Sequence, residues 1–304
     1  MKWLTSLDLP ALPPRPIDAH KGSAGGVLVV AGSYGMAGAA HLAACGARAA
    51  GAGYLRVACP QSIYEILAVL SPDAVFVPLR CSDDGRVIPG EYTKVLEAAE
   101  LSDAAVVGCG LGETAEAGAF FAAVMSELDL PAVIDASGLG LLSAKRDLLT
   151  RLPGGSILTP HPGEMARLLG RDTRDVLADR PAAVRDLAAL TGRTALLKGA
   201  RTLVCDGEHM YENSTGNAGM ATAGSGDVLS GLVAALVAGG LGAFDAGALG
   251  AYIHGGAGDV AASGKGRSLG PADIVEGLPG VIMRLERGRF ERGRPVRGPG
   301  RPPG

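Results

Sequence analysis

The chain has 304 residues, is 47% hydrophobic and carries a formal net charge of −3 at pH 7. This length and apolar content allow a large buried core, and the charge does not favour a general nucleic-acid-binding protein, so we expect no nucleic-acid partner. The five cysteines lie far apart without a CxxC pair, which argues against a disulfide framework and a zinc site. The N-terminus is too polar for a secretory signal and every apolar run is too short to cross a bilayer. We therefore expect a cytoplasmic protein with no membrane association.

Short β-rich runs alternate with longer helical patterns along most of the chain. In chain order, we expect strands at 27–31, 54–58, 74–79, 105–107, 132–135, 156–159, 195–197 and 202–205, and helices at 37–50, 115–128, 180–190, 227–238 and 243–262. Several of these strands are almost continuously apolar, as is typical of parallel strands buried on both faces. The alternation predicts an α/β layered fold, whose ligands bind beyond the carboxyl ends of the strands.

The pattern contains no internal linker and no repeat, so we expect one folded domain over residues 21–286. Residues 1–20 carry several prolines and are expected to form an N-terminal extension over the surface. Residues 287–304 are rich in Arg, Gly and Pro, a composition that cannot bury enough apolar area to fold. We expect them to form a disordered basic tail.

The segment 213–231 is the most informative stretch of the sequence. It surrounds one acid, Asp227, with glycines and small residues, and then continues as an apolar helical pattern. Glycines allow close approach of a ligand, and the free N–H groups and dipole of a helix N-terminus attract anions. The segment therefore predicts a phosphate site formed by Gly224, Ser225 and Gly226, with Asp227 as a proton-handling group. The simpler interpretation makes Asp227 a helix cap.

Two further glycine-rich turns follow expected strands. The first, at 31–40, is similar to a nucleotide-phosphate loop but lacks the GxGxxG order and a Walker lysine, so a close-packed strand–helix turn explains it equally well. The second, at 108–112, alternates glycines, including Gly110 and Gly112, in a way that suits either ligand approach or a tight turn.

Two polar segments also follow expected strands. In the first, prolines on both sides of His161 hold that side chain in one direction, which favours a ligand contact. Glu164 opens the next helix, where it either caps the helix or holds a water molecule on a phosphate-bound metal ion. The second segment runs through Lys198, Gly199, Ala200, Arg201 and Thr202. It suits the phosphates or ribose of a nucleotide, although Lys198 could also be a solvated hairpin charge.

Together these motifs resemble the ADP-dependent (S)-NAD(P)H-hydrate dehydratases of the ribokinase-like superfamily. The resemblance rests on Gly32-Ser33 with Gly38-Ala39-Ala40, on Thr-Pro-His-Pro-Gly-Glu at 159–164, on Leu-Lys-Gly at 197–199, and on Gly-Asn-Ala-Gly-Met-Ala-Thr-Ala-Gly-Ser-Gly-Asp at 216–227. It covers about residues 21–285. It implies a three-layer α/β/α fold with a mostly parallel central sheet.

The resemblance also implies a repair reaction. NADH hydrate or NADPH hydrate would be returned to the normal cofactor at the expense of ADP, yielding AMP and phosphate, with Mg²⁺ on the phosphates. Asp227 would be the general base, and the hydrate would lie against Ala39, Gly110, Gly112, His161 and Asp227. The adenine nucleotide would lie against residues 198–202 and Gly226. A homo-oligomer and a separate NAD(P)H-hydrate epimerase are further expectations from this resemblance.

The sequence departs from the family pattern at three positions. Ala218 stands where proline is common, Ala223 where glycine is common and Ser225 where threonine is common. Each substitution keeps a small residue, and Ala223 is the one that would resist a positive φ.

Two other functions fit parts of the pattern. A small-molecule kinase of the same superfamily, acting on a hydroxyalkyl heterocycle, would use Asp227 unchanged, so the His161 segment is what separates it from a dehydratase. A nucleotide-binding sensor would gain nothing from an acid beside a phosphate.

Overall fold

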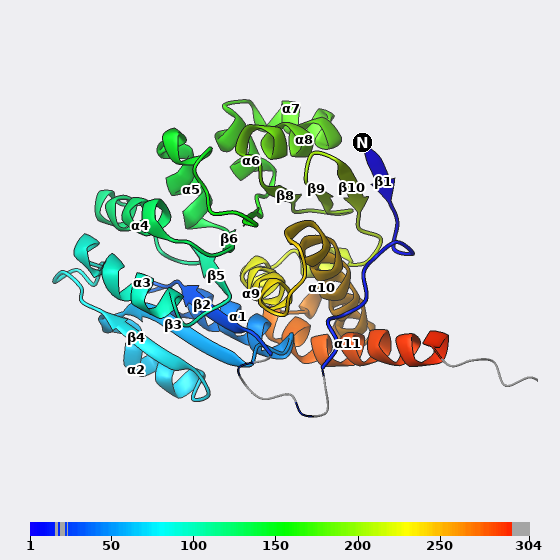
Figure 1. Cartoon of the computed structure of the whole chain (residues 1–304), viewed down its shortest axis with the longest axis horizontal. Coiled ribbons are helices and arrows are strands. Elements are labelled where there is room, and N and C mark those ends of the chain that lie inside the picture. The colour runs from blue at the N-terminus through cyan, green and yellow to red at the C-terminus, as the bar shows by residue number, and fades with distance from the viewer. Residues whose placement is uncertain (16–17, 19–21, 23, 294–304) are drawn as a thin grey trace, which may run out of the picture.

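A ten-stranded sheet forms the centre of the molecule (Figure 1). The computed structural model describes residues 1–15, 18, 22 and 24–293. The strands are β1 (Lys2–Leu4), β2 (Gly26–Val30), β3 (Tyr54–Pro60), β4 (Val75–Leu79), β5 (Ala104–Val107), β6 (Ala132–Ile134), β7 (Ile157–Leu158), β8 (Thr194–Leu197), β9 (Leu203–Cys205) and β10 (His209–Glu212). The helices are α1 (Ala37–Ala49), α2 (Gln61–Leu70), α3 (Tyr92–Ala99), α4 (Ala115–Glu127), α5 (Ser137–Ala144), α6 (Pro162–Leu169), α7 (Thr173–Ala178), α8 (Arg180–Thr191), α9 (Ser225–Ala238), α10 (Ala243–Lys265) and α11 (Pro271–Gly293).

The strand order is β1-β10-β9-β8-β7-β6-β5-β2-β3-β4. Neighbouring strands pair in parallel, except that β9 runs antiparallel to both β8 and β10. From β2 the chain first builds outward through β3 and β4, and then returns to add β5 on the other side of β2. The carboxyl ends of β2 and β5 therefore flank a topological switch point, where ligands bind in open α/β sheets.

Two apolar cores lie on opposite faces of this sheet. Along β2, Leu28 and Val30 contribute to one core, whereas Val27 and Val29 contribute to the other, because successive side chains of a strand point to opposite faces. Helices α3, α4, α5, α6 and α8 cover the first core, and α1, α2, α9, α10 and α11 cover the second. This arrangement confirms the three-layer α/β/α fold with a mostly parallel sheet (Figure 1).

The eight strands and five helices expected from the sequence are all present, with ends displaced by a few residues. Within the described part of the chain, the sequence analysis missed β1, β10 and the helices α2, α3, α5, α7 and α11, and it expected α6 to open at Glu164 without giving its extent. Helices α3, α5, α6 and α7 are short, at six to eight residues. Such helices present few turns from which a helical period can be recognised.

The described residues near both ends of the chain include regular elements outside the expected domain. Residues 2–4 form β1, which pairs in parallel with β10 at the edge of the sheet, so part of the N-terminal extension belongs to the fold. Helix α11 continues to Gly293, so residues 287–293, expected in the disordered tail, are helical. No proline interrupts the chain between 280 and 294, and Pro295 is the first residue that would. The rest of the expected tail, 294–304, lies outside the described residues, as do residues 16–17, 19–21 and 23.

Helices α1 and α9 pack with their backbones in direct contact. A Cβ atom added to Gly231 of α9 would lie 1.9 Å from the carbonyl oxygen of Ala43, and one added to Gly46 of α1 would lie 2.2 Å from that of Val228. No side chain fits at either position. The two glycines therefore allow the close spacing of α1 and α9.

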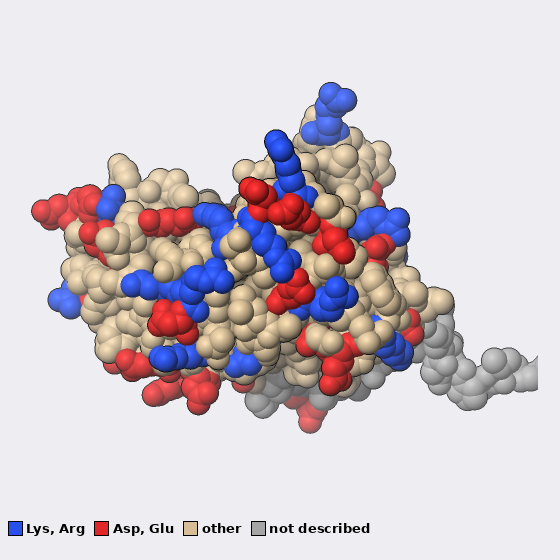
Figure 2. Space-filling view, turned by 90° about the horizontal axis from the view of Figure 1, so that it is seen from above, with Lys and Arg blue, Asp and Glu red and all other residues tan. Residues whose placement is uncertain are grey.

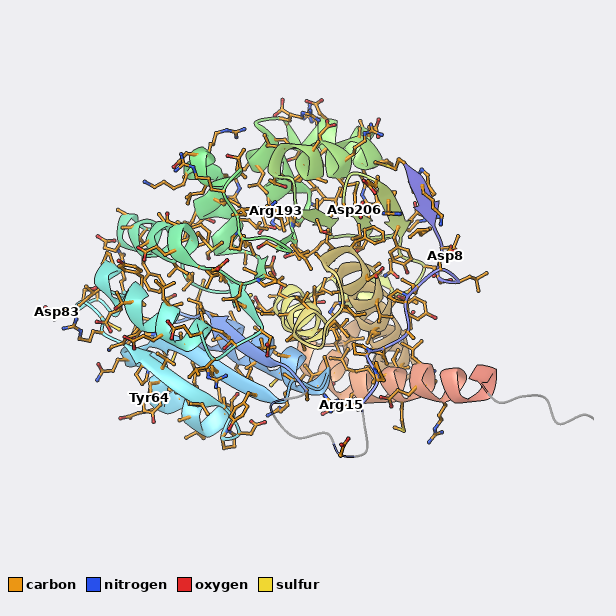
Figure 3. All side chains as sticks on the ribbon, in the orientation of Figure 1. Asp8, Arg15, Tyr64, Asp83, Arg193 and Asp206 are labelled. Atoms are coloured by element: carbon orange, nitrogen blue, oxygen red, sulfur yellow. The ribbon has the colours of Figure 1, made fainter. Side chains whose placement is uncertain are left out.

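Polar side chains outside the sheet edge have structural roles. Arg193 precedes β8 and donates to the carbonyl oxygens of Leu152 and Pro153, which ties this strand to the loop before β7 (Figure 3). Acidic and basic side chains are interspersed on the face that carries α7 and α8 (Figure 2), where Arg171 pairs with Asp186 at 2.8 Å.

Among the described helices, none combines the length and apolar character needed to cross a membrane.

Candidate active site

The loops that follow β2 and β5 are joined at the topological switch point. The backbone N–H of Gly32 donates to the carbonyl oxygen of Cys109 at 2.8 Å, and the hydroxyl of Ser33 donates to that of Gly110 at 2.7 Å. Ala39 lies against the same turn, because a Cβ atom added to Gly110 would come within 2.9 Å of the Ala39 methyl group. The structure thus brings Ala39 and Gly110 together, as the sequence analysis expected.

The N-terminus of α9, where the sequence analysis expects an anion site, lies beside these loops. Gly224 precedes the helix with φ of 93°, a conformation that favours glycine. Ser225, Gly226 and Asp227 form the first turn, whose N–H groups have no partner within the helix. Among the described residues, only Ala136 and Arg201 combine a side chain with a positive φ. Ala223 therefore meets none of the strain that the sequence suggested.

Asp227 faces the buried thiol of Cys109 and the buried carboxylate of Asp135. Ligand atoms of these three residues all lie within 4.8 Å of one another, so the Cys109 thiol lies beside the Asp227 carboxylate. Burial and the charge of Asp135 raise the pKa of Asp227 to about 6, against smaller opposing effects of the Cys109 hydrogen bond and the Lys198 charge. A carboxylate of this kind is a base matched to neutral pH.

Asp135 directly follows β6 and is 1% exposed. It accepts from the Lys198 ammonium at 2.5 Å and from the Ser230 hydroxyl of α9 at 2.7 Å. Burial alone would raise the pKa of Asp135, but the Lys198 charge and these hydrogen bonds hold it below its usual value. Burial likewise opposes the charged form of Lys198, yet Asp135 and Glu164 raise the pKa of its ammonium. Both partners are therefore charged at neutral pH, and Lys198 is no solvated hairpin charge.

His161 and Glu164 form a capping box at the start of α6. The Nδ1 atom of His161 accepts from the backbone N–H groups of Gly163 and Glu164, at 3.0 and 3.3 Å. In return, the backbone N–H of His161 donates to Glu164 at 2.8 Å. This confirms the capping role of Glu164 that the sequence suggested. Burial raises the pKa of Glu164, although Lys198, 3.9 Å away, opposes the shift.

The expected nucleotide loop between β8 and β9 is held from outside by α8. Arg180 donates to the carbonyl oxygens of Ala200 and Arg201 at 2.7 and 3.2 Å. The hydroxyl of Thr202 donates to that of Gly199 at 3.0 Å, and Arg201 pairs with Glu212 across the hairpin. The loop begins at Lys198, whose ammonium group lies beside Gly226. The loop and the N-terminus of α9 therefore lie next to each other.

A cavity of about 250 Å³ opens next to the two joined loops. Its lining includes Gly32, Ser33 and Tyr34 after β2, Gly112 after β5, and Arg86 from the segment after β4. The N–H of Gly112 donates to the Ser137 hydroxyl at 3.1 Å. A second hollow of about 500 Å³ lies between α10, α11 and Thr215. The cavity therefore opens at the carboxyl ends of β2 and β5, whereas no lining residue of the second hollow comes from α9 or from these loops.

The sequence analysis missed three members of this site: Asp135, Cys109 and Ser230. Asp135 was the final residue of an expected strand, and Cys109 stood within an expected glycine turn without a role of its own. An acid directly after a buried strand was the available signal, because the carboxyl ends of parallel strands meet at one edge of the sheet. Ser230 has no such signal, since only the position of α9 brings it to Asp135.

Comparison with known proteins agrees with this geometry. Residues 27–280 match the family described as NAD(P)H-hydrate dehydratase. The chain is 41% identical over 278 residues to a bifunctional NAD(P)H-hydrate repair enzyme of Moorella thermoacetica, with 90% of this chain and 52% of that protein covered. It is 40% identical over 231 residues to the ADP-dependent (S)-NAD(P)H-hydrate dehydratase of Neisseria meningitidis, with 75% and 74% covered.

Solved structures give the same picture. The ADP/ATP-dependent NAD(P)H-hydrate dehydratase of Bacillus subtilis, co-crystallised with ATP and Mg²⁺, is similar with a TM-score of 0.75 and 26% identity, covering 92% of this chain and 100% of that one. Ribokinase of Arabidopsis thaliana, 16% identical with a TM-score of 0.55 over 86% of this chain and 98% of its own, shares the fold. The chain spans about half the length of the bifunctional relatives, at 52% and 53%. On the family match and these identities, the chain belongs to the NAD(P)H-hydrate dehydratase family.

Proposed function

We propose that this protein dehydrates (S)-NADH hydrate and (S)-NADPH hydrate at the expense of ADP, yielding NADH or NADPH, AMP and phosphate. The observation that carries the proposal is the position of Asp227. Its carboxylate, with a pKa raised to about 6, lies in the first turn of α9 among Cys109, Asp135 and Lys198. A base beside a positively charged site that would bind phosphate suits phosphoryl transfer to a hydroxyl group.

The reaction would proceed in two steps. Asp227 removes the proton of the hydroxyl on the nicotinamide ring, and the oxygen attacks the terminal phosphorus of ADP, so the bond to AMP breaks. The N–H groups of Gly224, Ser225 and Gly226 and the Lys198 ammonium stabilise the charge on the transferred group. Phosphate then leaves the ring with its bonding electrons, and loss of the proton on the neighbouring carbon restores the double bond.

The substrates would lie on opposite sides of the α9 N-terminus. The hydrate would contact Ala39, Gly110, Gly112 and His161, and Gly112 is the one of these that lines the cavity after β2. The adenine nucleotide would contact Lys198, Gly199, Ala200, Arg201 and Thr202 together with Gly226. With the two substrates bound in this way, the ring hydroxyl and the terminal phosphate would lie on either side of Asp227.

Magnesium would accompany the phosphates of ADP and neutralise part of their charge. Cys109 does not suit this ion, because Mg²⁺ prefers oxygen ligands and an octahedral shell rich in water. Each Glu164 oxygen carries a lone pair beyond its contact with His161. Glu164 could therefore hold a magnesium-bound water molecule, as the sequence analysis suggested.

Several predictions from the sequence accompany this function. We expect a homo-oligomer in the cytoplasm, in which the five cysteines stay reduced; all five are free in the structure. We also expect cooperation with a separate NAD(P)H-hydrate epimerase, and a folded domain that spans residues 21–286.

The decisive experiment mixes chemically hydrated NADH with the protein, ADP and Mg²⁺ and follows the return of the absorbance of the reduced nicotinamide ring. Asp227→Asn preserves the shape of the side chain and removes the base, so we expect recovery with the native protein and none with the variant. No recovery with ADP or ATP, from protein shown to be folded, would contradict the proposal. ATP-dependent phosphorylation of a hydroxyalkyl heterocycle would then identify the protein as a kinase.

A further inference from the structure

The Lys198 ammonium is held at one place on the site, over the first turn of α9. A Cβ atom added to Gly226 would lie 3.3 Å from the Lys198 nitrogen and 3.5 Å from an Asp135 oxygen. The lysine side chain is 19% exposed, and its nearest acids are Asp135, at 2.5 Å, and Glu164, at 3.9 Å. A lysine has a flexible four-carbon stem, so its ammonium goes where its partners hold it.

Two side-chain hydrogen bonds and the packing of the local backbone hold Asp135 in place. One oxygen accepts from Lys198 and the other from the Ser230 hydroxyl. Its carbonyl group packs so closely on the turn after β5 that a Cβ atom on Gly108 would come within 2.2 Å of it. The next residue, Ala136, adopts φ of 49° and ψ of −121°. A residue with a side chain is strained in this conformation, and such strain concentrates at functional sites.

From this geometry we propose that Asp135 is a positioning residue, which fixes the Lys198 ammonium over the α9 N-terminus, where the phosphoryl group is transferred. The inference rests on the proposed function, because it concerns the charge that develops during that transfer. In the absence of Asp135, Glu164 is the remaining described acid within 4 Å of the Lys198 ammonium, at 3.9 Å, and the ammonium would turn toward it. The cation would then point at the start of α6 instead of at Gly226.

A second consequence concerns the base. The charged or titratable groups that face Asp227 are Cys109 at the end of β5, Asp135 at the end of β6 and Lys198 at the end of β8. Asp135 makes Asp227 more basic, whereas Lys198 and Cys109 make it less so. Asp135 therefore acts on both reacting partners, on the phosphate through Lys198 and on the hydroxyl through Asp227.

The test compares Asp135→Asn, Lys198→Met and the double variant, with full-length protein. Loss of the fixed cation costs transition-state stabilisation, so we expect kcat to fall on the order of 100-fold in each single variant. Because both changes remove one interaction, kcat of the double variant should match that of Lys198→Met within about threefold. The Kd for ADP should change little in Asp135→Asn, since the variant loses the anchor of a cation but also an anion that repels phosphate. Losses that multiply, or an unchanged kcat in Asp135→Asn, would overturn the proposal.

Two further variants separate positioning from folding. Ser230→Ala removes the donor to one Asp135 oxygen but leaves the carboxylate paired with Lys198, so we expect a several-fold loss of kcat with a smaller loss of stability than in Asp135→Asn. Glu91→Gln is the matched control, because Glu91 is also a buried acid, 2% exposed, paired with Arg80 and Lys94 away from the site. It should lower stability without changing kcat. A loss of kcat in Glu91→Gln equal to that in Asp135→Asn would reduce Asp135 to a folding role.

A spectroscopic readout keeps this proposal separate from the dehydratase reaction. An ammonium held by a buried carboxylate exchanges its protons slowly, so Lys198 should give a ¹H–¹⁵N ammonium resonance, assigned by its loss in Lys198→Met. We expect this resonance to disappear or shift in Asp135→Asn and to stay in Glu91→Gln. An unchanged resonance in Asp135→Asn would refute the positioning role, whether or not the protein acts on hydrated NADH. A native protein with the resonance but without dehydration would instead refute the proposed function.

Discussion

The thiol of Cys109, just after β5, lies within 4.8 Å of the carboxylate of Asp227 in the first turn of α9. Cys109 is fully buried, and burial raises the pKa of this thiol well above its usual value, with the charges of Asp227 and Asp135 adding to the shift. The thiol therefore stays protonated and serves as a donor. Its contact lowers the pKa of Asp227, against the effect of burial.

Substitutions at Cys109 should move the pH dependence of catalysis in opposite directions. Cys109→Ala removes the donor, so the pKa of Asp227 should rise above about 6. Because only the ionised carboxylate acts as a base, the acid limb of the kcat/KM profile should move to higher pH. Cys109→Ser supplies a stronger donor and should move the acid limb to lower pH. Cys59→Ala, at another fully buried cysteine, is the control that should leave the limb in place. Limbs that move in the same direction in both Cys109 variants would contradict this role.

Asp227→Asn should stabilise the protein while it abolishes activity. In the folded state the pKa of Asp227 is raised from 3.8 to about 6, so the folded protein pays for its ionised form above that pH. Below about pH 3.8 the acid is protonated in both states and the variant gains nothing. The gain should therefore grow as pH rises through this window and reach up to about 3 kcal/mol.

Urea unfolding of the native protein and of Asp227→Asn, at about pH 4.5 and about pH 8, measures this difference. The variant should be more stable at the higher pH, with the two curves approaching each other at the lower pH. A difference in the free energy of unfolding that is equal at both values would show that the charge of Asp227 is not its cause.

Gly226→Ala should impair nucleotide use without destabilising the fold. The added methyl group would stand 3.3 Å from the Lys198 nitrogen, in the space where we propose that the phosphate binds. Alanine favours helix over glycine by about 0.5–1 kcal/mol, which offsets the crowding. The Kd for ADP, measured by calorimetry, should rise at least tenfold. Gly264→Ala in α10, where the methyl group would meet nothing within 4 Å, should leave the Kd unchanged.

Two variants of His161 divide its capping role from its proposed substrate contact. His161→Ala removes the acceptor for two backbone N–H groups of α6 and should cost about 1 kcal/mol of stability, whereas His161→Asn keeps a good cap. If His161 contacts the hydrate, both variants should raise the KM for that substrate. Restoration of KM in His161→Asn would assign His161 to capping alone. Thermal unfolding and steady-state kinetics on the same samples provide both readouts.

The sequence was sufficient for the architecture, because apolar strands alternate with helices of recognisable period. The elements that it missed carry weaker patterns: β10 reads His-Met-Tyr-Glu, with polar residues at both ends, and α5 holds two glycines in eight residues. Helix α6 was expected to open at Glu164, but its extent could not be predicted, since eight residues give little periodic signal.

The candidate site could be predicted only where chemistry is concentrated in a short segment. The run of 216–227 marks Asp227 by its own composition. Asp135, by contrast, depends on Lys198, which is 63 residues away in the sequence, and on Ser230, which is 95 residues away. Such contacts exist only after the sheet has brought strand ends together, so no local pattern indicates them.

The contact between α1 and α9 gives Gly231, which takes no part in the proposed reaction, an influence on the position of Asp227. Gly231 lies one turn beyond Asp227 and faces the backbone of α1 at Ala43 and Ala47. A side chain at this position would tilt α9, and with it Asp227. Gly231→Ala would therefore yield a folded protein of low turnover or no folded protein. A survey of inactivating substitutions in this chain would then report two groups of positions, one touching the substrate and one that only sets the distance between two helices.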